Sequence, residues 1–144
     1  MIKLISKFAL FILIAALLFL LISGNLLSSS PFVITGQILA IALSAWARRS
    51  FKDKQFSIHA QPVGGALLIS GPYRFIRHPM YAAALLFLWS SVLGHLSSLT
   101  LGIGLIVTLV VAVRISVEEK FLKASYPNHA DYAQNTKRVL PFIF

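Results

Sequence analysis

The sequence predicts an all-α integral membrane protein with about four transmembrane helices and both termini in the cytoplasm. Composition places the chain in a bilayer, because 58% of its 144 residues are hydrophobic and only 12% are charged. The mean hydropathy is +0.83. The apolar residues are gathered into separate runs, and every basic residue falls on one side of these runs. These observations together set the fold class.

Four apolar segments reach, with their flanking residues, the length of about 20 residues that a bilayer-spanning helix needs. They run over about residues 8–22, 31–47, 80–93 and 99–113. The connections within each pair are short, which predicts two helical hairpins. The first segment follows two lysines and precedes a Ser/Asn-rich stretch, so a cleaved signal peptide is the alternative there. Its apolar run is long for a signal peptide, which favours a retained helix.

The basic residues predict how the helices are oriented. All 13 Lys and Arg side chains fall in the N-terminal tail, in the loop before residue 80, or from residue 114 onward. The two connections on the opposite side carry none, and His95 is their only ionisable residue. By the positive-inside rule, both termini and the central loop lie in the cytoplasm. We therefore expect a multi-pass protein in a cytoplasmic or inner membrane.

We expect one membrane domain over residues 1–144. Its N-terminal helical hairpin covers 1–48, a cytoplasmic loop covers 49–78, and the C-terminal hairpin and tail cover 79–144. The pI near 10.4 does not predict a nucleic-acid partner, because the basic residues flank apolar runs and do not alternate with aromatic residues. The predicted partner is the lipid bilayer.

The stretch 71–81, which reads GPYRFIRHPMY, joins the central loop to the third apolar segment. Pro72 and Pro79 lack an N–H and disfavour a regular helix across the stretch. Pro79 nevertheless suits the first turn of a helix that begins there. The free N–H groups of a helix start favour a carboxylate or a phosphate. The alternative is a juxtamembrane loop whose arginines contact lipid headgroups and whose tyrosines lie in the interfacial belt.

Arg114, Glu118 and Glu119 follow the fourth apolar segment, and the predicted topology puts them on the same side of the membrane as this helix start. Arg114 and Glu118 are four residues apart and share a helix face. A carboxylate could bind at the helix start through His78 and Arg77. An ammonium could bind to Glu118 or Glu119, and a ligand with an amino-acid end needs both. The alternative is an ordinary salt bridge at a snorkelling helix end.

Several other chemistries find no support in the sequence. The chain has no cysteine, so disulfides, thiolate metal sites and a cysteine nucleophile are excluded. The four histidines are scattered and form no HExxH pattern, so we expect no metal site. Gly64 and Gly65 lack the rest of a dinucleotide-binding fingerprint, and there is no P-loop.

The residues from 64 to 144 resemble one known family. The GPYRFIRHPMY stretch is followed by Arg114, the Glu118-Glu119 pair, Tyr126 and Tyr132, and by an ending that reads RVLPF. This pattern is similar to that of the isoprenylcysteine carboxyl methyltransferases, integral-membrane enzymes with phospholipid N-methyltransferases as distant relatives. The resemblance implies S-adenosylmethionine as the cofactor. The first two helices match the family only in being hydrophobic.

Position by position, the resemblance implies two roles at the site. Arg114 would orient the substrate, and Glu118 would bind the amino group of the cofactor. The cofactor contacts that it implies are Gly65, Ala66, Leu67, Leu68, Tyr73, His78, Pro79, Met80, Tyr81, Glu118 and Glu119. Gly65 stands where a eukaryotic member has a histidine, and Ala83 where the family often has a glycine. The extra spans of eukaryotic members are also missing, which argues against a prenylated-protein substrate.

The implied activity is methyl transfer to a small or lipophilic acceptor, such as a carboxylate, that enters from the bilayer. Because the methyl group of S-adenosylmethionine is already activated, the protein would supply proximity and alignment, without a metal or a covalent intermediate. The sequence does not determine whether the acceptor atom is oxygen, nitrogen or sulfur. One alternative is an NADPH-dependent reductase of the sterol type, against which the acidic pair argues. A second is a small non-enzymatic membrane scaffold.

Overall fold

The computed structural model of the chain describes residues 2–50 and 68–139. In these two ranges the backbone forms five α-helices, one short 3-10 helix and a single β-bridge, and it contains no strand. The elements in chain order are α1 (Ile2–Ile22), α2 (Pro31–Arg49), η1 (Gly71–Arg74), α3 (Pro79–Gly94), α4 (Ser98–Ser125) and α5 (His129–Asn135). The predicted all-α class is confirmed for these residues.

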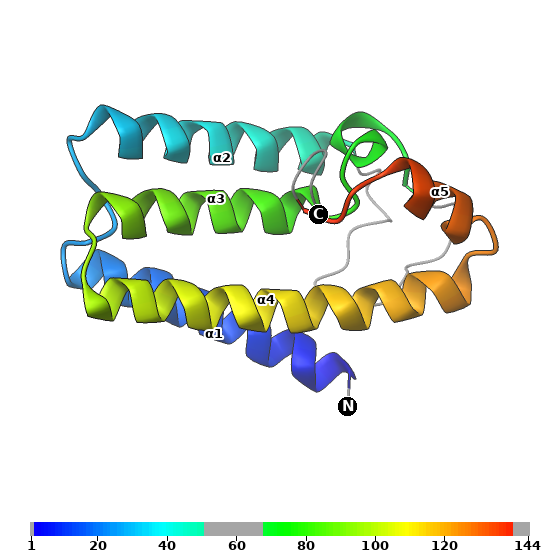
Figure 1. Cartoon of the computed structure of the whole chain (residues 1–144), viewed down its shortest axis with the longest axis horizontal. Coiled ribbons are helices and arrows are strands. Elements are labelled where there is room, and N and C mark those ends of the chain that lie inside the picture. Colours follow the sequence, from blue (N-terminus) through cyan, green and yellow to red (C-terminus); the bar gives the residue numbers. More distant parts are fainter. Residues whose placement is uncertain (1, 51–67, 140–144) are drawn as a thin grey trace.

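The four long helices lie alongside one another, and successive helices run in opposite directions (Figure 1). The α1–α2 and α3–α4 connections share one end of the bundle, while η1 and α5 share the other (Figure 1). α2 packs chiefly on α3, and α1 chiefly on α4. Each predicted hairpin therefore contributes one helix to each closely packed pair. The end with η1 and α5 also receives the basic C-terminal turn of α2 and the charged last turns of α4.

Two of these helices, α2 and α4, are long and apolar enough to cross a membrane. The apolar part of α1, Phe8–Ile22, and α3 are shorter apolar helices. α3 begins at Pro79, the residue at which the sequence predicted a helix start. α4 continues well past the apolar segment that ends near residue 113, so the charged residues that follow this segment are helical.

Small residues allow α2 and α3 to approach closely. A Cβ atom added to Gly36 would lie 2.0 Å from Ser90 Oγ, and one added to Gly94 would lie 2.2 Å from Val33 Cγ2. Neither helix could keep its present position with a larger side chain there. Association between apolar helices in a bilayer depends on such close van der Waals packing, since lipid tails are as apolar as the helix surfaces.

A buried polar cluster ties the first connection to the α2–α3 pair. The amide Nε2 of Gln37 donates to the Leu26 carbonyl at 2.7 Å and to Ser91 Oγ at 3.0 Å. Ser91 Oγ in turn lies 2.9 Å from the same carbonyl, to which it donates. Gln37 and Ser91 are both buried, and their mutual hydrogen bonds offset the loss of hydration. This cluster fixes the end of the bundle that lies away from the predicted site.

Candidate functional site

The predicted site lies where the start of α3 meets the last turns of α4. His78 is the N-cap of α3, and Pro79 occupies its first turn, where a missing N–H leaves no helical bond unmade. The C-terminal residues run beside this start. A parallel β-bridge joins Ile76 to Lys137. The Arg77 N–H donates to the Lys137 carbonyl at 2.7 Å, and the His78 N–H donates to the Arg138 carbonyl at 2.9 Å.

Glu119 is the acidic centre of this end of the molecule. Its Oε1 accepts a 2.9 Å hydrogen bond from Arg77 Nε and a 2.8 Å hydrogen bond from His78 Nε2. The other oxygen, Oε2, lies 3.7 Å from His129 Nε2. The Arg77, His78 and Glu119 side chains are all largely buried, and a buried charge of this kind needs a partner. The three groups satisfy one another.

Arg77 also fastens the C-terminal part of the chain. Its Nη1 donates to the Ala133 carbonyl at 3.0 Å and to Thr136 Oγ1 at 3.1 Å, and it also reaches the Thr136 carbonyl. These acceptors lie at the end of α5, where helical carbonyls have no partner within the helix and favour a cation. One guanidinium therefore joins α4, α5 and the start of α3.

Glu118 takes part in a second chain of hydrogen bonds. The Tyr81 hydroxyl donates to Glu118 Oε2 at 2.8 Å and accepts from Arg114 Nε at 2.6 Å. The Arg114 guanidinium carbon also lies 5.4 Å from the centre of the Tyr81 ring, a cation–π distance. His78 Nδ1 is 4.0 Å from Glu118 Oε2, so the imidazole lies between the two glutamates. Arg114 and Glu118, which the sequence places on one helix face, are joined by the Tyr81 hydroxyl, which bonds to both.

Tyr73 and Tyr132 lie at the same end of the bundle. The Tyr132 hydroxyl donates to the Tyr73 carbonyl at 2.6 Å, which ties α5 to η1. Burial raises the pKa of Tyr73, and the charge of Glu118 raises it further. Burial likewise raises the pKa of Tyr132. Both phenols are therefore neutral at physiological pH and can serve as hydrogen-bond donors.

Most of the residues expected at the site share this end of the molecule. Those that the structure places there are Tyr73, His78, Pro79, Met80, Tyr81, Arg114, Glu118 and Glu119. Leu68 is half-buried at the edge of the described range. Gly65, Ala66 and Leu67 lie outside the described residues, so their expected contacts stay predictions.

Two features of the site were not predicted from the sequence. Arg77 and His78 were expected to bind a ligand carboxylate, yet in the described residues both bond to Glu119. The sequence analysis assigned His129 no role, but this residue is buried beside Glu119, and its Nε2 has no hydrogen-bond partner. Only the tail folding back on the start of α3 brings His129 here. The sequence gives no direct sign of that contact.

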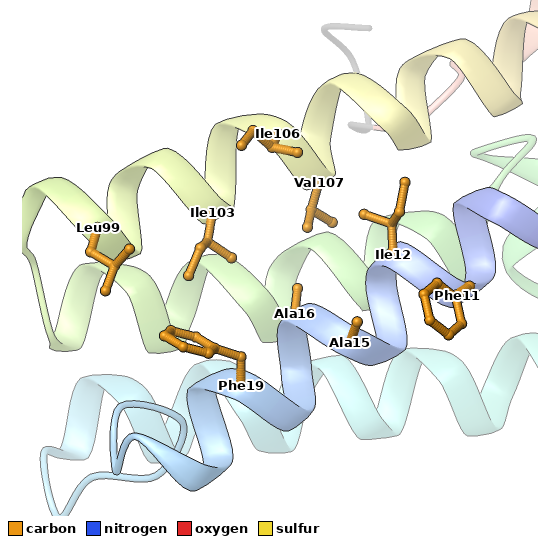
Figure 2. A pocket seen from close by; sticks show the side chains of 9 residues that line it. All are labelled: Phe11, Ile12, Ala15, Ala16, Phe19, Leu99, Ile103, Ile106 and Val107. Atoms are coloured by element: carbon orange, nitrogen blue, oxygen red, sulfur yellow. The ribbon is translucent and has the colours of Figure 1, made fainter.

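An apolar cavity of about 360 Å³ lies between α1 and α4. The side chains that line it are Phe11, Ile12, Ala15, Ala16, Phe19, Leu99, Ile103, Ile106 and Val107. Figure 2 shows Leu99, Ile103 and Val107 of α4 pointing toward α1. The resemblance assigned Arg114 to the substrate and Tyr81 to the cofactor, and neither residue lines this cavity. In the described part of the chain, no group of three or more His, Asp or Glu side chains is placed to hold a metal ion.

Comparison with known proteins identifies the family. One similar protein is the cobalt-zinc-cadmium resistance protein CzcN of Cupriavidus metallidurans (strain ATCC 43123 / DSM 2839 / NBRC 102507 / CH34). It is 26% identical over 117 residues, which make up 78% of this chain and 50% of the relative. The chain thus spans half the length of that curated relative, and no solved structure matches it. The model of the phospholipid methyltransferase family matches residues 30–129, from the start of α2 to the start of α5. Because this match covers most of the chain, the protein belongs to the phospholipid methyltransferase family.

Proposed function

We propose that this protein is an S-adenosylmethionine-dependent methyltransferase that spans the membrane with four helices and has its site at the cytoplasmic face. The observation that carries the proposal is the accessible carboxylate of Glu118, held by Tyr81 within reach of Arg114. Family membership supports methyl transfer. The finer resemblance to isoprenylcysteine carboxyl methyltransferases adds the residue roles. The one-sided distribution of Lys and Arg supports the orientation.

The residues at this end fit an amino-acid-bearing methyl donor. The Glu118 side chain is 27% exposed, and a carboxylate at such a site binds an ammonium by charge-assisted hydrogen bonds. The charge of Glu118 helps to raise the pKa of Tyr73, and we assign the Tyr73 ring to flank the rest of the donor, as the resemblance implies. When bound, S-adenosylmethionine supplies a methyl group already activated on a sulfonium. The protein contributes position and alignment.

Arg114 is the residue that we assign to the acceptor. It is buried, with 7% of its surface exposed, on the face of α4 that looks toward α3. A cation at this depth in a membrane helix usually has a functional partner. We assign it the orientation of an acidic group on a small or lipophilic acceptor that reaches the site from the bilayer.

The two alternative functions are less well supported. A sterol-type reductase would place the 2′-phosphate of NADPH near Glu118 and Glu119, where two carboxylates would repel it. A non-enzymatic scaffold gives no reason for His78, Tyr81, Arg114 and Glu118 to share one end of the bundle. Membership of a methyltransferase family favours neither of them.

Ligand binding by the purified protein in detergent tests the proposal. S-adenosylmethionine and S-adenosylhomocysteine should each raise the melting temperature, by an amount that corresponds to about 2.7 kcal/mol at a hundred times the dissociation constant. NADPH should produce no comparable shift. Glu118→Gln should lower the affinity for both ligands about ten- to a hundredfold, because one charge-assisted hydrogen bond is lost.

Asp131→Asn is the matched control, since it removes the same charge from an exposed position on α5. It should leave the affinity unchanged. The acceptor class can be sought with donor that carries a labelled methyl group, by following the label into the lipid or the aqueous extract. Stabilisation by NADPH alone, or an unchanged affinity in Glu118→Gln, would contradict the proposed site.

A further inference from the structure

The two adjacent glutamates have different surroundings. Neighbouring residues on an α-helix point about 100° apart, yet Glu118 and Glu119 both reach the start of α3. The Glu119 side chain is 13% exposed, about half the value for Glu118. Glu118 accepts from the neutral hydroxyl of Tyr81, whereas Glu119 accepts from the cation Arg77 and from His78. Chemically identical side chains therefore have unequal capacity for a new cation.

A second ammonium has little to gain at Glu119. Oε1 already accepts two hydrogen bonds at 2.9 Å and 2.8 Å, and His129 covers Oε2 at 3.7 Å. A ligand cation could reach this carboxylate only by displacing Arg77 or His78. Displacement would leave a buried polar group without its partner, which is unfavourable. At Glu118 the hydrogen-bond partner is the neutral Tyr81 hydroxyl, and His78 Nδ1 lies farther away, at 4.0 Å.

Glu119 controls the position of the C-terminal segment through Arg77. Arg77 Nε is held by Glu119, and its Nη1 holds the end of α5 at Ala133 and Thr136. The backbone completes the junction, because Lys137 N–H donates to the Phe75 carbonyl at 3.0 Å. Removing the carboxylate charge would free the guanidinium to turn away from α5. The same change would release the His78 ring, which lies against Glu118.

We infer that Glu119 is a positioning residue that holds His78 and, through Arg77, fastens residues 129–139 over the start of α3, while Glu118 alone receives the ammonium of the methyl donor. The second half of this inference rests on the proposed function. The first half concerns the protein without ligand. The two halves can therefore be tested separately.

The ligand half is tested with S-adenosylhomocysteine and an analogue that lacks only the α-amino group. Glu118→Gln should weaken S-adenosylhomocysteine about ten- to a hundredfold and leave the analogue within about twofold. Glu119→Gln should weaken both ligands by the same factor, because it acts on the shape of the site and not on the amine. Asp131→Asn should affect neither. A selective loss of S-adenosylhomocysteine in Glu119→Gln would overturn the assignment.

The structural half is tested by hydrogen exchange in the ligand-free protein. Glu119→Gln should speed exchange of the Arg77, His78 and Lys137 amides at least about tenfold, since these amides close the junction with the tail. Arg77→Lys keeps the charge but loses the several N–H donors of the planar guanidinium, and it should give the same acceleration. Glu118→Gln should not. Unchanged exchange in Glu119→Gln would overturn the fastening role.

The two experiments also separate this inference from the function on which it rests. A wild-type protein that binds neither ligand would reject the proposed function, and with it the assignment of the ammonium to Glu118. The exchange rates would still decide whether Glu119 fastens the tail. If the wild-type protein binds both ligands and Glu119→Gln selectively weakens S-adenosylhomocysteine, the proposed function stands and the inference is rejected.

Discussion

The Tyr81 hydroxyl donates a 2.8 Å hydrogen bond to Glu118 Oε2. The hydroxyl oxygen itself accepts from Arg114 Nε at 2.6 Å. One phenol therefore joins Arg114, which we assign to the methyl acceptor, with Glu118, which we assign to the methyl donor. A hydroxyl can bridge a cation and an anion in this way because it donates and accepts at once. The first prediction removes this bridge.

Tyr81→Phe should destabilise the protein by about 1–3 kcal/mol, because Arg114 Nε loses a buried acceptor. The ring under the guanidinium stays, so the loss should not extend to the packing of α3 on α4. Thermal unfolding in detergent measures the effect. Tyr126→Phe removes a hydroxyl from the end of α4 and serves as the control, with a change within about 0.5 kcal/mol expected. Equal stability of Tyr81→Phe and wild type would contradict the bridge.

The second prediction concerns pH and His129. Burial lowers the pKa of His129 below its ordinary value of about 6.5, although the nearby Glu119 acts in the opposite direction and Arg77, His78 and Lys123 add to the lowering. Below that ordinary value the unfolded chain binds a proton that the folded chain resists. Stability should therefore fall as the pH is lowered from 7 to 5.

His129→Gln should flatten this part of the stability profile, because glutamine does not titrate. His95→Gln changes a histidine at the opposite end of the bundle and should keep the wild-type slope. Chemical unfolding at a series of pH values measures both variants. If His129→Gln lost stability on acidification as steeply as wild type, another group would be responsible.

The third prediction tests the close approach of α2 and α3. In Gly36→Ala the new methyl would lie 2.0 Å from Ser90 Oγ and 2.8 Å from Ser90 Cβ, so a rotation of the hydroxyl cannot relieve the overlap. Overpacking of this kind costs about 1–3 kcal/mol. Gly102→Ala is the control, because nothing lies within 4 Å of a Cβ there.

A compensating change makes this prediction sharper. Ser90→Gly removes both clashing atoms, so the double variant Gly36→Ala with Ser90→Gly should recover much of the stability lost by Gly36→Ala alone. Thermal unfolding of the four proteins gives the coupling. Simple additivity of the two single changes would show that the helices do not meet at these residues.

The fourth prediction tests the orientation in the membrane. Since the chain has no cysteine, single cysteines can be introduced without background labelling. Ser29→Cys lies in the α1–α2 connection, and Asp131→Cys lies on α5 at the other end of the bundle. In intact cells, a membrane-impermeant maleimide should label Ser29→Cys only. Labelling of Asp131→Cys before lysis would reverse the predicted topology.

The sequence predicted those parts of the fold that depend on local signals. The helix start at Pro79 follows from the ring of proline itself, and the apolar segments follow from hydropathy. The continuation of α4 through Glu118 and Glu119 was less evident, because hydropathy ends before the helix does. Charged residues that favour helices extend it into water.

The tertiary relations at the site could not be read from the sequence. Nothing local distinguishes Glu118 from Glu119, since they are adjacent and identical. Their difference arises because Arg77 and His78, which lie just before α3, contact only Glu119 by hydrogen bonds. The position of His129 likewise depends on a tail that pairs with a segment far earlier in the chain. Such contacts depend on the packing of elements that are distant in the sequence, and hydrophobic periodicity does not predict them.

The bridge between Ile76 and Lys137 also implies an order of assembly. Arg77 and Thr136 are 59 residues apart along the chain, and α3 and α4 lie between them. Closing so long a loop is entropically unfavourable unless the helices have already brought its ends together. The helices must therefore pair before the tail can dock. A variant with a weakened α2–α3 contact would then lose its candidate site first, while its helices were still formed.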